Sequence, residues 1–444
     1  MLKKIARIVL FAVGVALPLE AVGKVFIGVF TLTPVRAITA VALLFAILDM
    51  VLSGPRVPRS SKNLWVLAFF VALVIGCVYG SLYSGLPPLI YVLKWTRFGS
   101  VLLFYLVLCQ LVTTRRDLDA FLGGFVVGGT LAAISAFTGD VEWSGETERR
   151  AGFGGGANQH AGNLLTALPL AYALFFSVRQ KVLKPMLVTA VLIMSAGVVA
   201  AASRSAFLAA LGMGGVWMMR FRRPSDLKYV IAMALVIVVG VFAAPRAYMS
   251  RIATIKDAFA SLVSGDSRPS PEVEIGNRVE VMRAAVGAFV SSPFGAGVGN
   301  FGPWAVKNGY KMPADVSVHN AVLQVGAELG IVGVVPYLAI VVMTWTQLSR
   351  ARRLANRFRV LGDTELAYLG LRAVMVQIGF IGIAVVAQFQ PGMIWKGMWG
   401  MFGISTALLG VTERRIRQLR ALGSGEETGT AYYRDARGAE PARG

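Results

Sequence analysis

Residues 185–219, PMLVTAVLIMSAGVVAAASRSAFLAALGMGGVWMM, decide what kind of fold this chain adopts. Arg204 is the only charged residue in the stretch, and it lies in a short SRS turn between two apolar runs. Each run approaches the roughly 20 residues that a helix needs to cross the hydrocarbon of a membrane. Because lipid offers no hydrogen bonds to peptide groups, we interpret the stretch as two spanning helices joined by a tight turn.

The whole chain shares this apolar character. Of its 444 residues 56% are hydrophobic and only 15% are charged, and the mean hydropathy is +0.66, values that exclude an ordinary soluble protein. The pattern predicts an all-α polytopic membrane protein with about twelve spans. The candidate spans are 5–22, 35–51, 64–80, 95–112, 118–137, 161–177, 185–202, 205–219, 229–244, 321–348, 366–387 and 394–411.

The positive charges indicate how these spans are oriented. The chain has 44 Lys and Arg against 23 Asp and Glu, a net charge of +21. The loops on the side of the N-terminus carry 27 of the cations and the opposite loops 16, half of them in one long loop. Since cytoplasmic loops carry the excess of Lys and Arg, we expect both termini in the cytoplasm. The basic residues then contact anionic membrane lipids, and no nucleic-acid partner is expected.

The predicted domains follow from this topology. Residues 1–244 form nine spans, 245–316 a long periplasmic loop with two amphipathic helices, and 317–411 three further spans. The tail 412–444 is rich in glycine and polar residues toward its end and is expected to be disordered. Within the long loop, PFGAGVGNFGPW resembles a phosphate loop, but no strand precedes it, so we interpret it as a tight turn packed on a helix.

Metal and redox chemistry are not indicated. The two cysteines, Cys77 and Cys109, lie inside apolar runs, and the chain has only two histidines, His160 and His319. These residues do not form the usual ligand spacing of a metal site, so neither a metal nor another cofactor is expected.

Polar residues near the predicted outward ends of the spans are the candidates for chemistry. Arg204, Arg278 and His319 each have an ordinary explanation: a side chain reaching the interface, an ion pair with Glu274, and a helix start. Together they offer two guanidinium forks that fit a pyrophosphate and one imidazole that can accept a proton. We therefore predict that Arg204 and Arg278 hold a pyrophosphate and that His319 is a general base.

Other polar residues are less specific. The candidates for hydrogen bonds to the substrate are Asn158, Gln159 and Asn320, although helix capping explains Asn158 or Gln159 equally well. His160 is a minor candidate for a second functional imidazole. Glu328 is expected on the opposite helix face from His319, as a packing residue. The sequence does not reveal the partners of Glu20, Arg97 and Arg372, which are candidates for ion pairs within the membrane.

Several of these segments resemble one known family when taken in order. They are GFGGGANQHAGNLLTALPLA (152–171), SRSAFLAAL (203–211), NRVEVMRAAVGAFVSSPFGAGVGNF (277–301) and VHNAVLQVGAELGIVG (318–333). Their order is similar to that of the O-antigen ligase and O-antigen polymerase superfamily of bacterial inner-membrane proteins, whose fold is that of the C-type glycosyltransferases.

The resemblance implies a metal-independent, inverting transfer of a glycan from undecaprenyl pyrophosphate to an acceptor hydroxyl at the periplasmic face. By resemblance Arg204 and Arg278 hold the lipid pyrophosphate, and His319 activates the acceptor. We favour a ligase whose acceptor is lipid A-core, because the short loops leave only one large outward element. A polymerase that extends a growing glycan is the alternative. A secondary transporter or lipid-glycan flippase is the alternative of another class, although the long loop has no counterpart in the first half.

Overall fold

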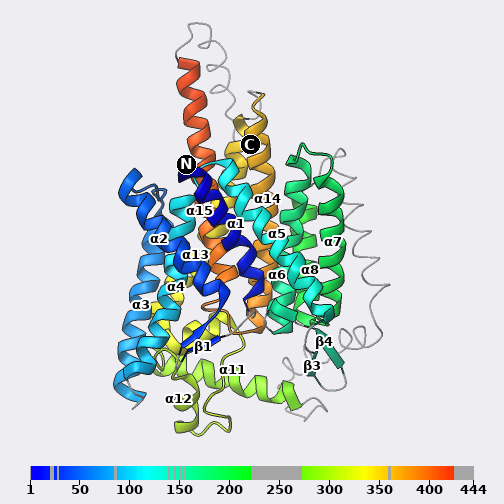
Figure 1. Cartoon of the computed structure of the whole chain (residues 1–444). Helices are drawn as coiled ribbons and strands as arrows, with labels where there is room; N and C mark the ends of the chain where they lie inside the picture. The colour runs from blue at the N-terminus through cyan, green and yellow to red at the C-terminus, as the bar shows by residue number, and fades with distance from the viewer. Residues whose placement is uncertain are drawn as a thin grey trace, which may run out of the picture.

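A computed structural model shows a bundle of long helices (Figure 1). The structure describes residues 2–20, 25–27, 30–84, 88–138, 141–144, 147–150, 152–154, 156–221, 273–358 and 362–424. The predicted ninth span, 229–244, and the first predicted loop helix lie outside these residues.

The helices account for most of the described chain. They are α1 (Leu2–Ala16), α2 (Pro34–Ser53), α3 (Ser61–Ser84), α4 (Pro88–Leu111), α5 (Arg115–Thr138), α6 (Ala157–Ser177), α7 (Leu183–Ala200), α8 (Arg204–Arg220), α11 (Val273–Ser291), α12 (Phe301–Lys307), α13 (Ala321–Phe358), α14 (Thr364–Val386) and α15 (Lys396–Ser424). Short 3₁₀ turns are η1 (Leu17–Leu19), η2 (Gly152–Gly154) and η5 (Ala387–Phe389). Eleven of the twelve predicted spans overlap one of these helices.

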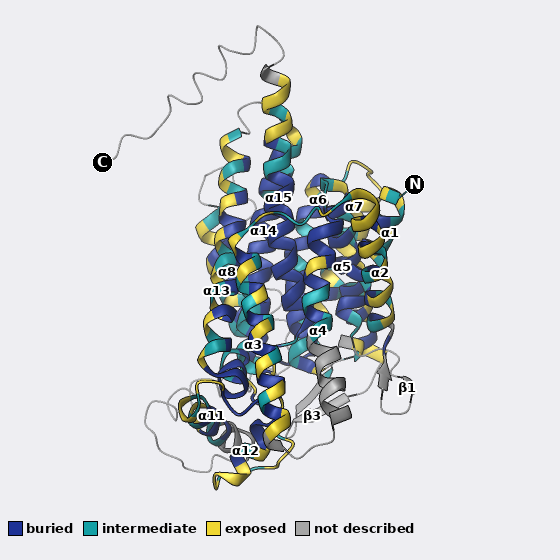
Figure 2. Ribbon diagram, turned by 90° about the vertical axis from the view of Figure 1, so that its left-hand side faces the viewer, coloured by how far each residue is buried: buried dark blue, intermediate teal, exposed yellow. Residues whose placement is uncertain are grey.

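Six helical segments in the described residues are long and apolar enough to cross a membrane. They are Val35–Ser53, Ser61–Leu82, Arg115–Thr138, Leu183–Ala200, Ala321–Phe358 and Thr364–Phe389. Apolar side chains are exposed on the outer faces of several of them, as lipid contact requires, whereas the centre of the bundle is buried (Figure 2). The protein is therefore a membrane protein, and the number of twelve crossings stays a prediction.

The fold is all-helical in class, as the sequence predicted, but short strands accompany the helices. Two antiparallel hairpins are present, β1 (Val25–Ile27) with β2 (Phe30–Leu32), and β3 (Val141–Ser144) with β4 (Thr147–Arg150). Both lie with α11 and α12 at the end of the bundle opposite the N-terminus (Figure 1). Such short strands between apolar spans carry too weak an alternation to be detected in the sequence.

Glycines allow α1 and α5 to pack backbone against backbone. A Cβ atom at Gly124 would lie 2.1 Å from the carbonyl oxygen of Phe11, and one at Gly128 would lie 2.2 Å from that of Val15. The two glycines are one helical turn apart on α5, so they form a continuous strip along which α1 lies. In membranes this small-residue spacing is a common basis for helix association.

We predict that Gly124→Val destabilises the protein far more than Gly123→Val. The first change places a methyl-bearing carbon against backbone, which cannot rotate away, whereas nothing lies within 4 Å of the Cβ position at Gly123. Overpacking of this kind costs about 1–3 kcal/mol. Thermal unfolding of the two purified variants in the same detergent measures the difference, and equal melting temperatures would contradict the packing argument.

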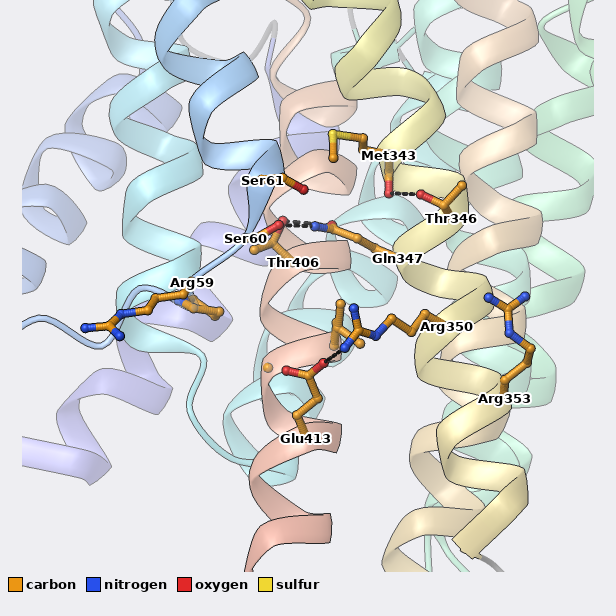
Figure 3. Close-up of a pocket in the computed structure, with 13 residues that line it drawn as sticks. Arg59, Ser60, Ser61, Met343, Thr346, Gln347, Arg350, Arg353, Thr406 and Glu413 are labelled. Carbon is orange, nitrogen blue, oxygen red and sulfur yellow. Dashed lines mark hydrogen bonds and ion pairs between the residues drawn. The ribbon is translucent and has the colours of Figure 1, made fainter. Parts of the chain in front are cut away.

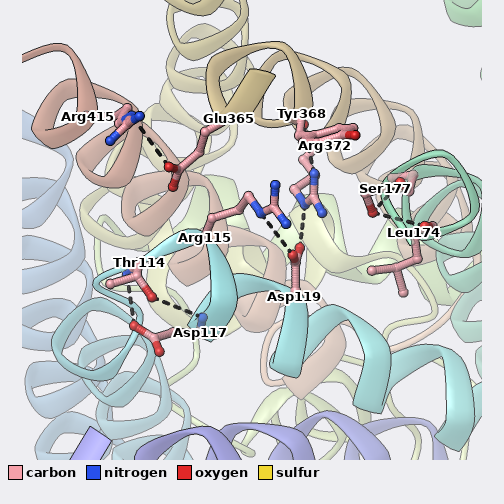
Figure 4. A network of polar contacts seen from close by, with 11 residues as sticks. Thr114, Arg115, Asp117, Asp119, Leu174, Ser177, Glu365, Tyr368, Arg372 and Arg415 are labelled. Atoms are coloured by element: carbon pink, nitrogen blue, oxygen red, sulfur yellow. Dashed lines mark hydrogen bonds and ion pairs between the residues drawn. The ribbon is translucent and has the colours of Figure 1, made fainter. Parts of the chain in front are cut away.

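A buried ion pair joins α5 to α14 near the N-terminal end of both helices. The Arg372 side chain is fully buried and its Nε donates to Asp119, which also pairs with Arg115 Nε at 3.4 Å (Figure 4). Arg372, whose partner the sequence did not reveal, thus has its counter-charge on a neighbouring helix. The side chain of Arg97 lies outside the described residues.

Helix α13 is interrupted near its beginning, although the sequence predicted one span over 321–348. Gly330 has φ 61° and ψ −155°, a backbone conformation open essentially to glycine alone. A Cβ there would also lie 2.1 Å from the carbonyl oxygen of Pro293. The break therefore separates a short first segment, which packs on α11, from the long membrane-crossing segment.

Helix α15 continues beyond the predicted end of the last span. It runs through the basic stretch after 411 to Ser424, where a disordered tail had been expected; residues 425–444 are not described. Arg415 in this extension donates through Nε to Asp363 at 3.0 Å. Burial raises the pKa of the Asp363 carboxyl, but bonds from the Leu366 amide and Arg415 offset this and bring the pKa below its ordinary value.

Candidate functional site

The α7–α8 turn presents Arg204 at the first position of a helix. Ser203 caps α8, because its Oγ accepts a hydrogen bond from the Ala206 amide at 3.2 Å. Ala202 has φ +44°, which is rare for a residue other than glycine, so the turn is tightly constrained. Arg204 is half-buried at the start of α8, where the helix dipole makes the potential positive and an anion is stabilised.

Asn158, in the first turn of α6, holds this turn in place. Its side-chain oxygen accepts a hydrogen bond from Ser203 Oγ at 2.8 Å, and its Nδ2 donates to the Phe389 carbonyl at 3.4 Å. The side chain predicted to contact substrate is therefore also a structural link. It connects the residue before Arg204 to the turn η5.

Asn320 makes the corresponding link for His319. Its Oδ1 accepts from the Leu323 amide at 2.9 Å and so caps α13, while its Nδ2 donates to the Gln388 carbonyl at 3.2 Å. His319 immediately precedes this cap and is exposed. Its place at the start of α13 agrees with the predicted helix start.

Two adjacent carbonyl groups of one turn therefore hold the segments that carry Arg204 and His319. Gln388 accepts from the cap of α13, and Phe389 accepts from Asn158, which in turn binds the cap of α8. Chain segments more than 100 residues apart thus meet at η5. Sequence analysis missed Gln388 and Phe389 because they act through backbone oxygens, which leave no side-chain signal.

Arg278 lies on α11, and its side chain is outside the described residues. One turn later Val281 is buried in a small hydrophobic cluster with Ala285, Phe301 and Val318. Val318 directly precedes His319, so the helix of Arg278 packs against the segment of the histidine. The backbone places the two segments together, and no side-chain distance for Arg278 follows from it.

Gln159 is held at the border of this region. Its Nε2 donates to Glu20 Oε2 at 2.9 Å, and the other carboxylate oxygen lies 3.3 Å from Lys396 Nζ. Glu20, which directly follows η1, is therefore bound by both α6 and α15. The sequence did not suggest Lys396 as its partner, since an ion pair between residues so distant in the chain has no local pattern.

His160 and Asn163 point to the buried side of α6. Neither ring nitrogen of His160, and neither polar atom of the Asn163 amide, has a hydrogen-bond partner among the described residues. Asn163 Oδ1 and Trp395 Nε1 both approach the Cβ position of Gly397, at 3.1 and 3.3 Å. Polar atoms buried in this way are costly unless a polar group binds them, so they mark a polar interior next to Asn158 and Gln159.

The glycine-rich loop after α11 is structural. The amides of Ala296 and Val298 donate to the carbonyls of Ala327 and Gly76 at 2.7 and 3.1 Å. The Gly299 amide donates to Glu328 Oε2 at 2.8 Å. A phosphate loop needs such amides for its ligand, so the engaged amides favour the predicted tight turn, and Glu328 is a packing residue as expected.

In the part of the chain that the structure describes, no three His, Cys, Asp or Glu side chains cluster as a metal site would require. What the region does combine is a cation at a helix start, an exposed imidazole and several amides. This donor set suits an oxyanion and a hydroxyl-bearing ligand.

We predict that Asn158→Asp and Asn320→Asp are energetically coupled. Each aspartate keeps the oxygen that accepts from the capping residues but can no longer donate to its η5 carbonyl. Once one link is lost the turn is loosened, so the second substitution lowers the free energy of unfolding by less than it does alone. The difference, which is the coupling energy, should be at least about 0.5 kcal/mol. Denaturant unfolding of the single and double variants in detergent measures the free energies.

Asn63→Asp is the matched control, because Asn63 Nδ2 also donates to a backbone carbonyl, that of Pro58 at 2.8 Å, but at the other end of the bundle. Paired with Asn158→Asp it should give additive losses. Additive losses for the Asn158 and Asn320 pair as well would show that η5 does not join them.

Comparison with known proteins gives one match. Residues 189–338 match the protein-family model described as O-antigen ligase, whereas no curated protein matches the chain. The matched segment contains Arg204, Arg278, His319 and Asn320; Asn158 and Gln159 precede it. The matched segment is about a third of the chain, and it is similar to the O-antigen ligase superfamily, as its motifs had suggested.

Proposed function

We propose that this protein transfers a glycan from undecaprenyl pyrophosphate to an acceptor hydroxyl, at the face of the membrane where η5 lies. The family supports a ligase- or polymerase-type reaction. The single observation that supports the site most is that η5 holds the starts of α8 and α13 through adjacent carbonyls. Arg204 and His319, neighbours of those caps, then face one substrate.

In the proposed reaction His319 accepts the proton of the acceptor hydroxyl. The acceptor oxygen forms a bond to the anomeric carbon as the bond from that carbon to the pyrophosphate oxygen breaks. The electron pair leaves with the pyrophosphate, whose added negative charge is held by Arg204, at the positive end of α8, and by Arg278. Attack opposite to the leaving group inverts the anomeric configuration, and no metal takes part.

Hydrogen bonds from amides complete the proposed site. Asn158 and Asn320 each donate one amide hydrogen to η5, so in this proposal they position Arg204 and His319 as well as contact the substrate. Gln159 lies beside the Glu20 and Lys396 pair, at the border where the first sugars of the donor would pass. Lys396 adds a cation on that side.

The acceptor is proposed to be lipid A-core, with a growing glycan as the alternative. The sequence favoured a ligase because only one large outward element was expected. The two hairpins, however, lie at the same end as α11 and α12, so that argument is weaker than the sequence alone suggested (Figure 1). The family match covers both types of acceptor chemistry, so the choice belongs to experiment.

We predict that His319→Ala lowers the transfer rate by about 10² to 10⁴, the usual contribution of a general base, while the donor still binds. Arg204→Gln should instead weaken binding of the lipid pyrophosphate as well as transfer. Single-turnover transfer with a labelled lipid-linked glycan measures the rate, and retention of the labelled donor measures binding.

Asn308→Ala is the control, because Asn308 is exposed in the same part of the chain and donates only to the Trp304 carbonyl of its own helix. It should transfer at the wild-type rate. A His319→Ala protein that transfers normally would remove the general base from the proposal.

The decisive experiment uses proteoliposomes that contain the full chain and the lipid-linked glycan, with and without lipid A-core. Gain of glycan mass on lipid A-core supports a ligase, and longer glycans on the carrier lipid support a polymerase. Movement of glycan lipid across the bilayer without any new glycosidic bond would support the flippase alternative and overturn glycan transfer.

A further inference from the structure

At the opposite end of the bundle, three segments enclose a pocket of about 390 Å³ (Figure 3). The lining comes from the segment before α3, from α13 and from α15. The size falls within the roughly 300–1,000 Å³ usual for ligand pockets. The proposed glycan site lies at the other end, so this pocket has no part in it.

The lining is strongly basic. The lining residues include three arginines, Arg59, Arg350 and Arg353, and a single acidic residue, Glu413. Arg350 pairs with Glu413 at 2.9 Å, whereas no carboxylate of the described residues lies within ion-pair distance of Arg59 or Arg353. The residues that line the pocket therefore carry a net positive charge, which favours an anionic occupant.

A buried lysine lies beneath the pocket. Lys62 is fully buried, and its Nζ donates to the Phe402 carbonyl at 2.8 Å, to Ser405 Oγ at 2.7 Å and to Gln347 Oε1 at 3.4 Å. All three acceptors are neutral. Gln347 also lines the pocket, so the buried amine and the pocket floor belong to one hydrogen-bond network.

Hydroxyl groups accompany the cations. Ser60, Ser61, Thr346 and Thr406 line the pocket, and Ser60 Oγ accepts from Gln347 Nε2 at 2.7 Å. Guanidinium forks with nearby hydroxyl donors are the groups that bind phosphate oxygens. The side chains that line the pocket are therefore of the types that bind a phosphate group.

The surroundings indicate where that phosphate comes from. Below the pocket, α3 exposes Leu64 and Leu67 at 67% and 55%, and α13 exposes Val342 and Leu338 at 59% and 41%. Leu64 follows Ser61 by three residues, so pocket and apolar side chains share one face of α3. The same holds on α13, where Val342 precedes Thr346 by four residues. A headgroup in the pocket would therefore have its acyl chains along two apolar helix faces.

We propose that this pocket binds the phosphate headgroup of an anionic phospholipid from the membrane leaflet on the side of the N-terminus. The phosphate lies among Arg59, Arg350 and Arg353, and the acyl chains follow α3 and α13. The lipid supplies a negative charge for Arg59 and Arg353, which pair with no carboxylate of the described residues. Basic pockets between helices are known to hold lipid headgroups in this way.

The test compares two double variants of the full chain that remove the same charge. Arg59→Gln with Arg353→Gln removes two pocket cations. Arg357→Gln with Arg417→Gln removes two exposed cations of the same end that do not line the pocket. Each delipidated protein is titrated with phosphatidylglycerol in detergent, and native mass spectrometry measures the bound fraction.

We expect the pocket variant to bind phosphatidylglycerol at least tenfold more weakly than the control variant, because general surface attraction is lost equally in both. Thr346→Trp, which fills the pocket without changing the charge, should weaken binding similarly. Equal affinities in the pocket and control variants would overturn the site. Melting temperatures equal to that of the wild type show that each variant is folded.

A second arm separates lipid from soluble phosphate. Glycerol 3-phosphate and inorganic phosphate carry the same anionic group without acyl chains, and at millimolar concentration they should displace little of the bound lipid. If they bind as tightly as phosphatidylglycerol, the site is one for a soluble phosphate and the lipid assignment is wrong. None of these measurements uses a glycan substrate, so their outcome is independent of the proposed function.

Discussion

The carbonyl groups of Gln388 and Phe389 are the constraint on which the proposed site depends. A helix start can point in many directions unless something fixes it, and here the starts of α8 and α13 are fixed against a third element by Asn158 and Asn320. Backbone oxygens suit this purpose, since their positions are set by the turn and not by a rotamer. The caps that terminate the two helices thereby also orient the residues next to them.

Hydropathy predicts most of the helices because a membrane leaves a helix few alternatives. Eleven of the expected segments are helical, and the SRS turn and the start of α13 were located closely. The same signal could not detect the break at Gly330, which depends on the carbonyl of Pro293 approaching from α11's end, nor the extension of α15. These features arise from contacts between distant segments.

The candidate site shows the same division. The residue types that carry phosphate and proton chemistry could be named from the sequence, and Arg204 and His319 do lie at elements joined by η5. The sequence could not show that Asn158 and Asn320 link elements, because each donates to a carbonyl group more than 60 residues away. Likewise, only the structure shows that Arg372 pairs with Asp119 and that Lys396 pairs with Glu20.

The break at Gly330 has a mechanical consequence for α13. Because helical register is interrupted there, rotation or sliding of the long segment about its axis is not transmitted as a rigid twist to the short segment that follows Asn320. The orientation of the short segment is set instead by its packing on α11 and by the hydrogen bond from Asn320 to η5. The long segment can therefore tilt or shift with the thickness of the bilayer while the short segment next to His319 keeps its orientation.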